Sequence, residues 1–405
     1  MPLDLAINDG LFFDGTGAPG ANKSVGISGG RVVELSDAPL VANETIDARG
    51  RWVMPGFLDM HTHYDAELLA APALTESLRH GVTTVTVGSC SISTILSVAD
   101  DCSDLFTRVE SVPREQVLPL LRSKKTWSTP KDYVAFLKQH PLGANVTAFL
   151  GHSDLRVRVM GLARAVDARA RPSTAELAEM ERWLSDALDA GLLGLSSMTN
   201  PWDKLDGDRH RSAQLPSTYA TWSEYRRLNR VLRARGRILQ SAPNLVTKVN
   251  VLLFLLGCLR GLLSPALRTT LITLADPKAN PGLNRVIGLV TRAFNFLGAN
   301  LRWQTLPVPF EVYADGMELV VFEEFPAGQA ALHLADEATR TKLDDRLDRY
   351  HEAPMEGLVG LVRMVNRSDG AVKAVIVNGR KAFADGAFAE DLGRGAGYGQ
   401  FLPAR

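Results

Sequence analysis

Two histidines close together in the sequence could form half of a metal site. His61 and His63 follow an apolar run, Val53–Asp59, that is predicted to be a buried strand. Side chains two residues apart in an extended chain point to the same side, so we expect the two imidazoles to project together. Imidazole nitrogens are common ligands of transition metals. The alternative is that both histidines are ordinary polar residues at a strand end.

Cys90 could supply a third ligand. It lies just past the next predicted strand, Thr83–Val87, in the turn Gly88-Ser89-Cys90-Ser91. A thiolate binds Zn²⁺ well, and zinc with three protein ligands and one open position lowers the pKa of bound water to about 7. Such an ion also polarises a carbonyl, which suits amide hydrolysis. The alternative for Cys90, which we expect for Cys102 and Cys258, is a small buried apolar residue.

The central part of the chain alternates between short apolar strands and helices such as Thr174–Ala190. The predicted strands are Val53–Asp59, Thr83–Val87, Val146–Leu150, Leu192–Ser196, Arg237–Gln240, Thr270–Leu274 and Arg302–Leu306. This alternation predicts an α/β fold with a TIM-type (β/α) barrel over residues 56–345, whose chemistry would lie at the carboxyl ends of the strands. After the seventh strand the sequence predicts a hairpin, Glu311–Phe325, and a polar helix, Ala331–Tyr350. The predicted barrel therefore lacks its last strand region.

Both ends of the chain consist of short β-rich runs separated by turn residues. The runs are Leu3–Phe13, Ser24–Ser28, Arg31–Leu35, Val372–Val377 and Arg380–Phe383. Their spacing predicts a small antiparallel sheet at the amino-terminal end, and Asn378-Gly379 is a strong hairpin signal at the other. Because neither end has enough apolar surface to be stable alone, we predict that residues 1–55 and 360–405 form one small β-sandwich beside the barrel.

The composition excludes several classes of function. The 45 Lys and Arg residues balance 45 Asp and Glu residues, so we expect neither a nucleic-acid binder nor an acidic tail. Three widely spaced cysteines argue for a reducing compartment rather than a disulfide framework. The first residues lack the apolar segment of a signal peptide, and the apolar stretch Val251–Leu263 is too short to cross a membrane. We expect a cytoplasmic protein without a membrane partner, and the sequence leaves its oligomeric state open.

His152 and Arg156 follow the third predicted strand, at the same rim as the histidine pair. We predict that they recognise the carboxylate or the acyl oxygen of a substrate, because a guanidinium group binds carboxylates with two parallel hydrogen bonds. The alternative places Arg156 on a charged helix face and His152 in the first turn of that helix.

The motifs of this chain resemble those of the amidohydrolase superfamily, and within it the N-acyl-D-amino-acid deacylase (D-aminoacylase) group. The resemblance rests on Pro-Gly-Phe-Leu-Asp-Met-His-Thr-His-Tyr-Asp at 55–65, Gly-Val-Thr-Thr at 81–84, Gly-Ser-Cys-Ser at 88–91, Gly-His-x-x-Leu-Arg at 151–156, Gly-Leu-Ser-Ser at 194–197 and Val-Ile-Val-Asn-Gly at 375–379. It implies a metal-binding barrel flanked by a sandwich from both termini. It also implies one or two Zn²⁺ ions, a small N-acyl substrate, and Cys90 as a ligand where many relatives use a modified lysine.

The chain departs from this group at the later strands. The group places a metal-binding histidine at the end of strand five and another at strand six, where this chain has Leu239-Gln240-Ser241-Ala242 and Leu274-Ala275-Asp276-Pro277. It also uses an Asp at the end of strand eight as general base, and no matching segment is found here. Asp276 is a weak substitute, while Asp65 and Glu67 are better suited to supporting the ligands or facing solvent. The catalytic base therefore stays unassigned.

Two functions are compatible with these residues. The first is a zinc-dependent hydrolase of a non-peptide C–N (amide) bond, which would deacylate N-acyl-D-amino acids or related N-acyl compounds. The second is a metal-binding amidohydrolase-like protein that is inactive because it lacks the general-base Asp.

Overall fold

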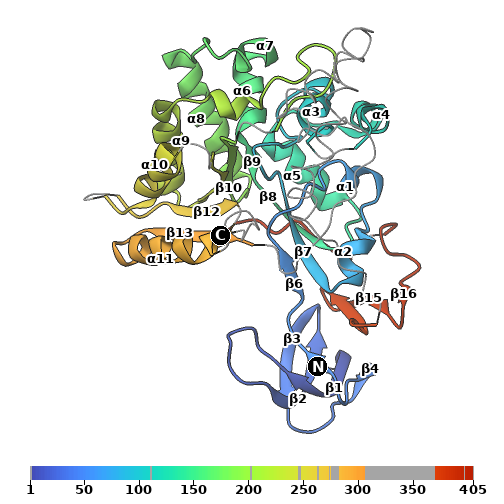
Figure 1. The fold of residues 1–405 in the computed structure, drawn as a ribbon. Helices are drawn as coiled ribbons and strands as arrows, with labels where there is room; N and C mark the ends of the chain where they lie inside the picture. Colours follow the sequence, from blue (N-terminus) through green and yellow to red (C-terminus); the bar gives the residue numbers. More distant parts are fainter. Residues whose placement is uncertain are drawn as a thin grey trace, which may run out of the picture.

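The computed structural model describes residues 2–109, 112–200, 203–244, 248–261, 264–272, 274, 282–305, 370–395 and 397–404 (Figure 1). The predicted hairpin Glu311–Phe325 and the predicted helix Ala331–Tyr350 lie outside the described residues, and so does Asp276.

The seven predicted central strands are confirmed. They are β6 (Phe57–Asp59), β7 (Val82–Val87), β8 (Asn145–Ala148) continued by β9 (Leu150–Gly151), β10 (Gly194–Met198), β11 (Ile238–Ala242), β12 (Arg268–Ile272) and β13 (Asn300–Gln304). They pair in parallel, in the orders β6-β7-β8 and β9-β10-β11-β12-β13. This confirms an α/β fold with parallel strands. Among the described residues no backbone pairing joins β13 to β6, so a closed barrel is not seen there.

Helices follow most of these strands and cover the parallel sheets (Figure 1). They are α1 (Glu67–Ala70), α2 (Thr75–Arg79), α3 (Ala99–Phe106), α4 (Arg114–Lys124), α5 (Pro130–Gln139), α6 (His152–Met160), α7 (Leu162–Ala165), α8 (Thr174–Asp189), the 3₁₀ turn η1 (Pro216–Tyr219), α9 (Trp222–Ala234), α10 (Lys248–Cys258) and α11 (Leu283–Phe296). Helix α8 illustrates why such segments form helices that pack on a sheet. A capping box of Ser173 and Glu176 starts the helix, and its apolar face, with Trp183 and Leu184, is buried.

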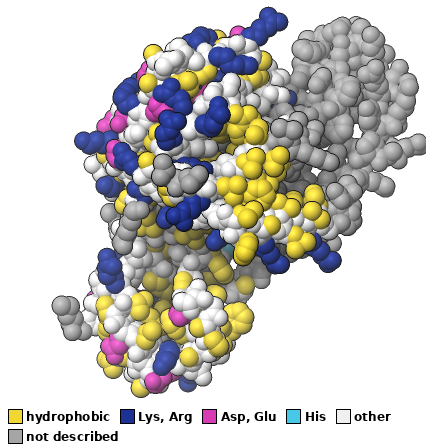
Figure 2. Space-filling view, turned by 90° about the vertical axis from the view of Figure 1, so that its left-hand side faces the viewer, with side chains coloured by type: hydrophobic (Ala, Val, Ile, Leu, Met, Phe, Trp, Pro, Cys, Tyr) yellow, Lys and Arg dark blue, Asp and Glu magenta, His cyan; other side chains and the backbone are white. Residues whose placement is uncertain are grey.

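Helix α11 packs on the sheet from one side only. Its Phe294 contacts the small cluster around Leu301 on β13, whereas Leu289 is 63% exposed and Phe296 is 91% exposed. Figure 2 shows hydrophobic side chains gathered on this face of the molecule. In the part of the chain that the structure describes, no helix has the length and apolar character needed to cross a membrane.

The amino-terminal sheet is mixed rather than purely antiparallel. It contains β1 (Leu3–Phe12), β2 (Ala21–Ser28), β3 (Arg31–Ser36), β4 (Ala42–Asp47) and β5 (Trp52–Val53). β1, β2 and β3 pair antiparallel as predicted. β4 and β5, which were not predicted as strands of this sheet, both pair with β1 in parallel. The reason is the connection before β4, which crosses back over the sheet and is held by both amide atoms of Asn8 on the backbone of Leu40.

The carboxyl-terminal hairpin forms as predicted. Its strands are β14 (Ala374–Val377), β15 (Arg380–Ala384) and β16 (Ala387–Phe388). Asn378 and Gly379 have φ of 47° and 83°, the left-handed pair that a two-residue turn of type I′ requires. Ile376 packs against an apolar cluster of the amino-terminal sheet that contains Leu5 and Val25. The assignment of residues 1–55 and 360–405 to one domain, and of 56–345 to another, stays a prediction.

The turn after β7 brings the chain very close to β9. Gly88 has φ of +73°, and a Cβ on this residue would lie 2.3 Å from the carbonyl oxygen of Phe149. Only glycine combines this backbone conformation with such a close approach. The turn continues directly into Cys90, so Gly88 decides where that thiol lies.

We predict that Gly88→Ala lowers the free energy of unfolding by about 2 to 4 kcal/mol, because both the left-handed backbone and the steric overlap are unfavourable. Gly29→Ala is the matched control: its φ is +57° and no atom lies within 4 Å of its added Cβ, so a loss of only about 1 kcal/mol is expected. Urea unfolding of both variants measures the difference, and equal losses would contradict the close approach.

Candidate metal centre

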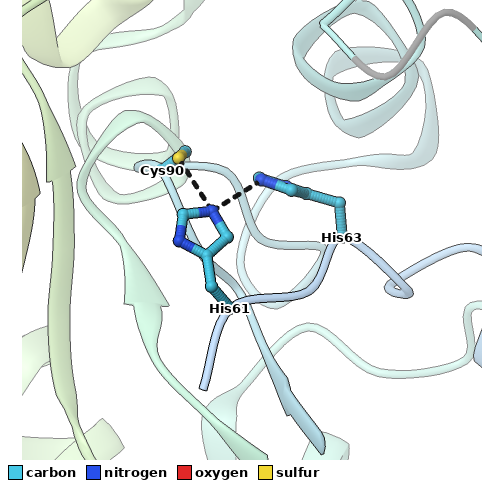
Figure 3. Close-up of side chains that lie close together, drawn as sticks. All are labelled: His61, His63 and Cys90. Atoms are coloured by element: carbon cyan, nitrogen blue, oxygen red, sulfur yellow. Dashed lines mark hydrogen bonds between the residues drawn. The ribbon is translucent and has the colours of Figure 1, made fainter. Parts of the chain in front are cut away.

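Three predicted ligands converge at the carboxyl ends of β6 and β7 (Figure 3). The Nε2 atom of His61 lies 3.1 Å from Nε2 of His63 and 3.2 Å from Sγ of Cys90. The ligand atoms of the three side chains all lie within 4.8 Å of one another. The i, i+2 spacing and the strand-end position of the cysteine therefore bring these side chains together as the sequence predicts.

The donor set fits a transition metal ion. In a tetrahedral zinc site, neighbouring ligand atoms are about 3.3 Å apart for two nitrogens and about 3.5 Å apart for nitrogen and sulfur. The two short separations around His61 are close to these values. Burial lowers the pKa of His61, and burial together with the charge of His61 lowers the pKa of His63 to about 3. Both imidazoles are therefore neutral near pH 7 and have a nitrogen lone pair to offer.

The histidine loop is held to the neighbouring strand by the residue between the two ligands. Thr62 donates two hydrogen bonds to the carbonyl oxygen of Thr86 on β7, from its amide at 3.1 Å and from its hydroxyl at 2.8 Å. At the preceding position, the His61 amide donates to the Asp59 carboxylate at 3.1 Å. The extended chain is thus fixed on both sides of the site, and the side chains of His61 and His63 are left facing Cys90.

Cys90 and Ser91 both adopt left-handed backbone conformations, with φ of 51° and 71°. Such conformations are unfavourable for residues with a Cβ and are concentrated at functional sites. Here two other strands stabilise them: Gln240 on β11 accepts from the Cys90 amide at 3.1 Å, and Ser196 on β10 accepts from the Ser91 amide at 3.1 Å. Gln240 lies in the segment where the D-aminoacylase group has a histidine. Its side chain is fully buried and holds the backbone of Cys90.

The three carboxylates considered as catalytic bases are Asp65, Glu67 and Asp276. Asp65 is buried, which raises its pKa to about 7, and it accepts a hydrogen bond from the Gly88 amide at 3.1 Å. It therefore links the histidine loop to the cysteine turn, as expected of a supporting residue. Glu67 is exposed at the start of α1, and Asp276 lies outside the described residues.

His152 and Arg156 lie on α6 and are both 0% exposed. The two side chains share one carboxylate: His152 Nε2 lies 2.7 Å from Glu224 Oε1, and Arg156 binds the other oxygen. His152 lies in the first turn of α6 and Arg156 lies on the same helix, as the alternative places them, but the charge of Arg156 is paired inside the protein. Because neither side chain reaches the surface, the placement favours a structural role. Nε and Nη2 of Arg156 have no hydrogen-bond partner among the described residues, and substrate recognition by His152 and Arg156 stays a prediction.

Glu224 was not singled out from the sequence. It lies three residues after Thr221, whose hydroxyl caps α9, so the pattern Thr-x-x-Glu indicates an ordinary capping box. In the structure the carboxylate turns inward instead. Burial by itself raises the pKa of Glu224, but the hydrogen bonds and charges of His152 and Arg156 outweigh this and hold the pKa below its usual value. The sequence does not show that Arg156 on α6 is buried, and this buried cation is what draws the Glu224 carboxylate inward.

A second buried carboxylate, Asp154, lies within the Gly-His-x-x-Leu-Arg motif and organises the loop after Cys90. Its oxygens accept hydrogen bonds from the Ser93 hydroxyl and from the amides of Ile95, Leu96 and Ser97, at 2.6 to 3.0 Å. A carboxylate with this many donors fixes a loop tightly. The motif therefore positions the chain that carries Cys90.

Comparison with known proteins agrees with these motifs. Residues 44–225 match the model of the amidohydrolase family. An uncharacterized protein of Mycobacterium tuberculosis is 52% identical over 348 residues, which are 85% of this chain and 57% of that protein. The N-acyl-D-glutamate deacylase of Alcaligenes xylosoxydans is 34% identical over 239 residues, 58% of this chain and 43% of that enzyme. The matched residues thus make up little more than half of the mycobacterial protein and less than half of the deacylase.

Solved structures show the same fold. The N-acyl-D-glutamate deacylase of Bordetella bronchiseptica, complexed with zinc and a phosphonate inhibitor, superimposes with a TM-score of 0.59 at 25% identity. The match covers 76% of this chain and 59% of that enzyme. A D-aminoacylase whose binuclear metal centre has been studied gives the same TM-score and coverage.

The shared carboxylate of Glu224 leads to a prediction. Glu224→Gln leaves the buried guanidinium of Arg156 without a counter-charge, so we expect a loss of about 3 to 5 kcal/mol in the free energy of unfolding. Glu181→Gln is the matched control: Glu181 also binds an arginine, Arg227, but both side chains are partly exposed, so less than about 1 kcal/mol is expected. Similar losses for the two variants in urea unfolding would contradict the buried ion pair.

Proposed function

Because residues 44–225 of this chain match the model of the amidohydrolase family, we propose that it is a metal-dependent hydrolase of a non-peptide C–N (amide) bond. We further propose that its substrates are N-acyl-D-amino acids or related N-acyl compounds, in line with the deacylases that it resembles. The observation that carries the proposal is the convergence of His61, His63 and Cys90 within the family-matched segment.

We propose that these three side chains hold the metal. The two histidines would offer neutral imidazole nitrogens and Cys90 a thiolate, a set that suits Zn²⁺. When bound, the ion supplies Lewis acidity, which polarises the amide carbonyl and makes a water molecule more acidic. Three ligands suffice for one ion, and the described residues hold no second group of three His, Cys, Asp or Glu side chains placed to bind a metal.

The other described residues around the site act by positioning. Thr62 and Asp65 tie the histidine loop to β7 and to its turn, and Gln240 fixes the cysteine backbone. Amide hydrolysis also needs a group that takes a proton from water and passes it to the leaving amine. We keep Asp276 as the candidate for that role, since Asp65 is engaged with the Gly88 amide.

A second candidate function is metal binding without hydrolysis. It is favoured by Gln240, whose amide is no general base and whose oxygen already accepts from the Cys90 amide, and by the metal-ligand group itself, which among the described residues contains no carboxylate. The two candidates differ in turnover and agree in metal content.

We predict that the purified protein binds about one equivalent of zinc and releases free amino acid from at least one N-acyl-D-amino acid. Metal analysis and a panel of N-acyl-D- and N-acyl-L-amino acids measure both. Zinc at full occupancy without turnover on the whole panel would exclude the hydrolase and leave the second candidate.

We also predict that Cys90→Ala abolishes zinc retention, because two imidazoles alone bind zinc weakly. Cys258→Ala is the control: Cys258 is equally free, but it is buried on α10 away from the histidines, so its zinc content should be unchanged. Zinc content by metal analysis after dialysis decides this, and a Cys90→Ala protein with normal zinc would show that the thiol is not a ligand.

A further inference from the structure

The last residue of β13 reaches the first histidine of the metal centre. The amide oxygen Oε1 of Gln304 lies 2.7 Å from Nδ1 of His61, although the two residues are 243 positions apart in the chain. β6 and β13 are the first and the last of the described central strands, and no backbone pairing joins them among the described residues. This side-chain contact therefore connects their carboxyl ends.

The chemistry of the contact determines which nitrogen of His61 carries the proton. An amide oxygen only accepts hydrogen bonds, so the ring nitrogen facing it must be the donor. In a neutral imidazole the other nitrogen then has the lone pair. That nitrogen is Nε2, the same atom that lies 3.1 Å from His63 and 3.2 Å from Cys90.

The surroundings of His61 make this choice hard to replace. The ring is partly buried, which limits the access of water that could accept from Nδ1 in place of Gln304. The orientation of the ring thus depends on an acceptor that another strand supplies.

We infer that Gln304 is a positioning residue of the metal centre: it holds His61 with Nδ1 protonated, so that Nε2 is free to bind the metal. The inference rests on the proposed function in requiring a metal at His61, His63 and Cys90. Hydrogen bonds to the second nitrogen of a metal-binding histidine fix its tautomer and typically change metal affinity ~10- to 100-fold.

The test measures Co²⁺ and Zn²⁺ binding by the purified full-length chain, together with the visible absorption of the Co²⁺ form. Gln304→Leu removes the acceptor, and we expect ~10- to 100-fold weaker binding of both metals with a changed Co²⁺ spectrum. Gln304→Glu keeps an oxygen acceptor at the same position, so it should bind at least as tightly as the parent protein and much more tightly than Gln304→Leu. Gln139→Leu, the same change at an exposed position on α5, should leave affinity and spectrum unaltered.

Two outcomes would overturn the inference: a Gln304→Leu protein with parental affinity and spectrum, or a Gln304→Glu protein that binds no better than Gln304→Leu. If Gln304→Leu does not fold, as judged by circular dichroism, Gln304→Glu decides alone by keeping or losing parental affinity. Because metal binding is measured without substrate, Gln304-dependent binding with no hydrolysis would refute only the proposed enzyme activity. Metal binding at this site that is independent of Gln304 would refute only the inference.

Discussion

The structure depends on a cysteine held in a backbone conformation that it would not adopt alone. Cys90 and the residue after it are both left-handed, which costs about 1 to 2 kcal/mol each. The two backbone amides donate hydrogen bonds to Gln240 on β11 and Ser196 on β10, which offsets this cost, and the Asp65 carboxylate accepts a hydrogen bond from the amide of Gly88. Contacts from β10, β11 and the histidine loop therefore fix the final position of the thiol beside the imidazoles.

Helix α6 shows how a motif can belong to an active site without facing its substrate. Its first turn has a buried carboxylate, Asp154, that fixes the loop after Cys90. Its His152 and Arg156 meet a second buried carboxylate, Glu224, on α9. A buried charge is tolerated only with a partner, so these pairs allow one relative position of the two helices and the cysteine turn. The position of the metal-binding side chains thus depends on buried ion pairs and hydrogen bonds that do not themselves contact the metal site.

Much of this arrangement could be predicted from the sequence, where the signal is local. Strand periodicity located the seven central strands, Asn378-Gly379 located the hairpin, and the spacing of His61, His63 and Cys90 predicted their convergence. The parallel pairing of β4, the inward turn of Glu224 and the contacts of Gln240 and Gln304 were not predicted. Each depends on a partner 32 to 243 residues away, and the local pattern around Glu224 even indicates a different role.

The contact between His61 and Gln304 also has a consequence for the order of assembly. The three ligands span residues 61–90, so they can meet after closing a short loop, whereas the acceptor for His61 must come from the far end of the parallel strands. Closing the longer loop costs more chain entropy and is slower. During folding or synthesis the metal-binding trio is therefore expected to form first as an imprecise site whose ring can flip. When β13 docks, Gln304 selects one tautomer of His61. The three side chains then form a metal site with a fixed geometry.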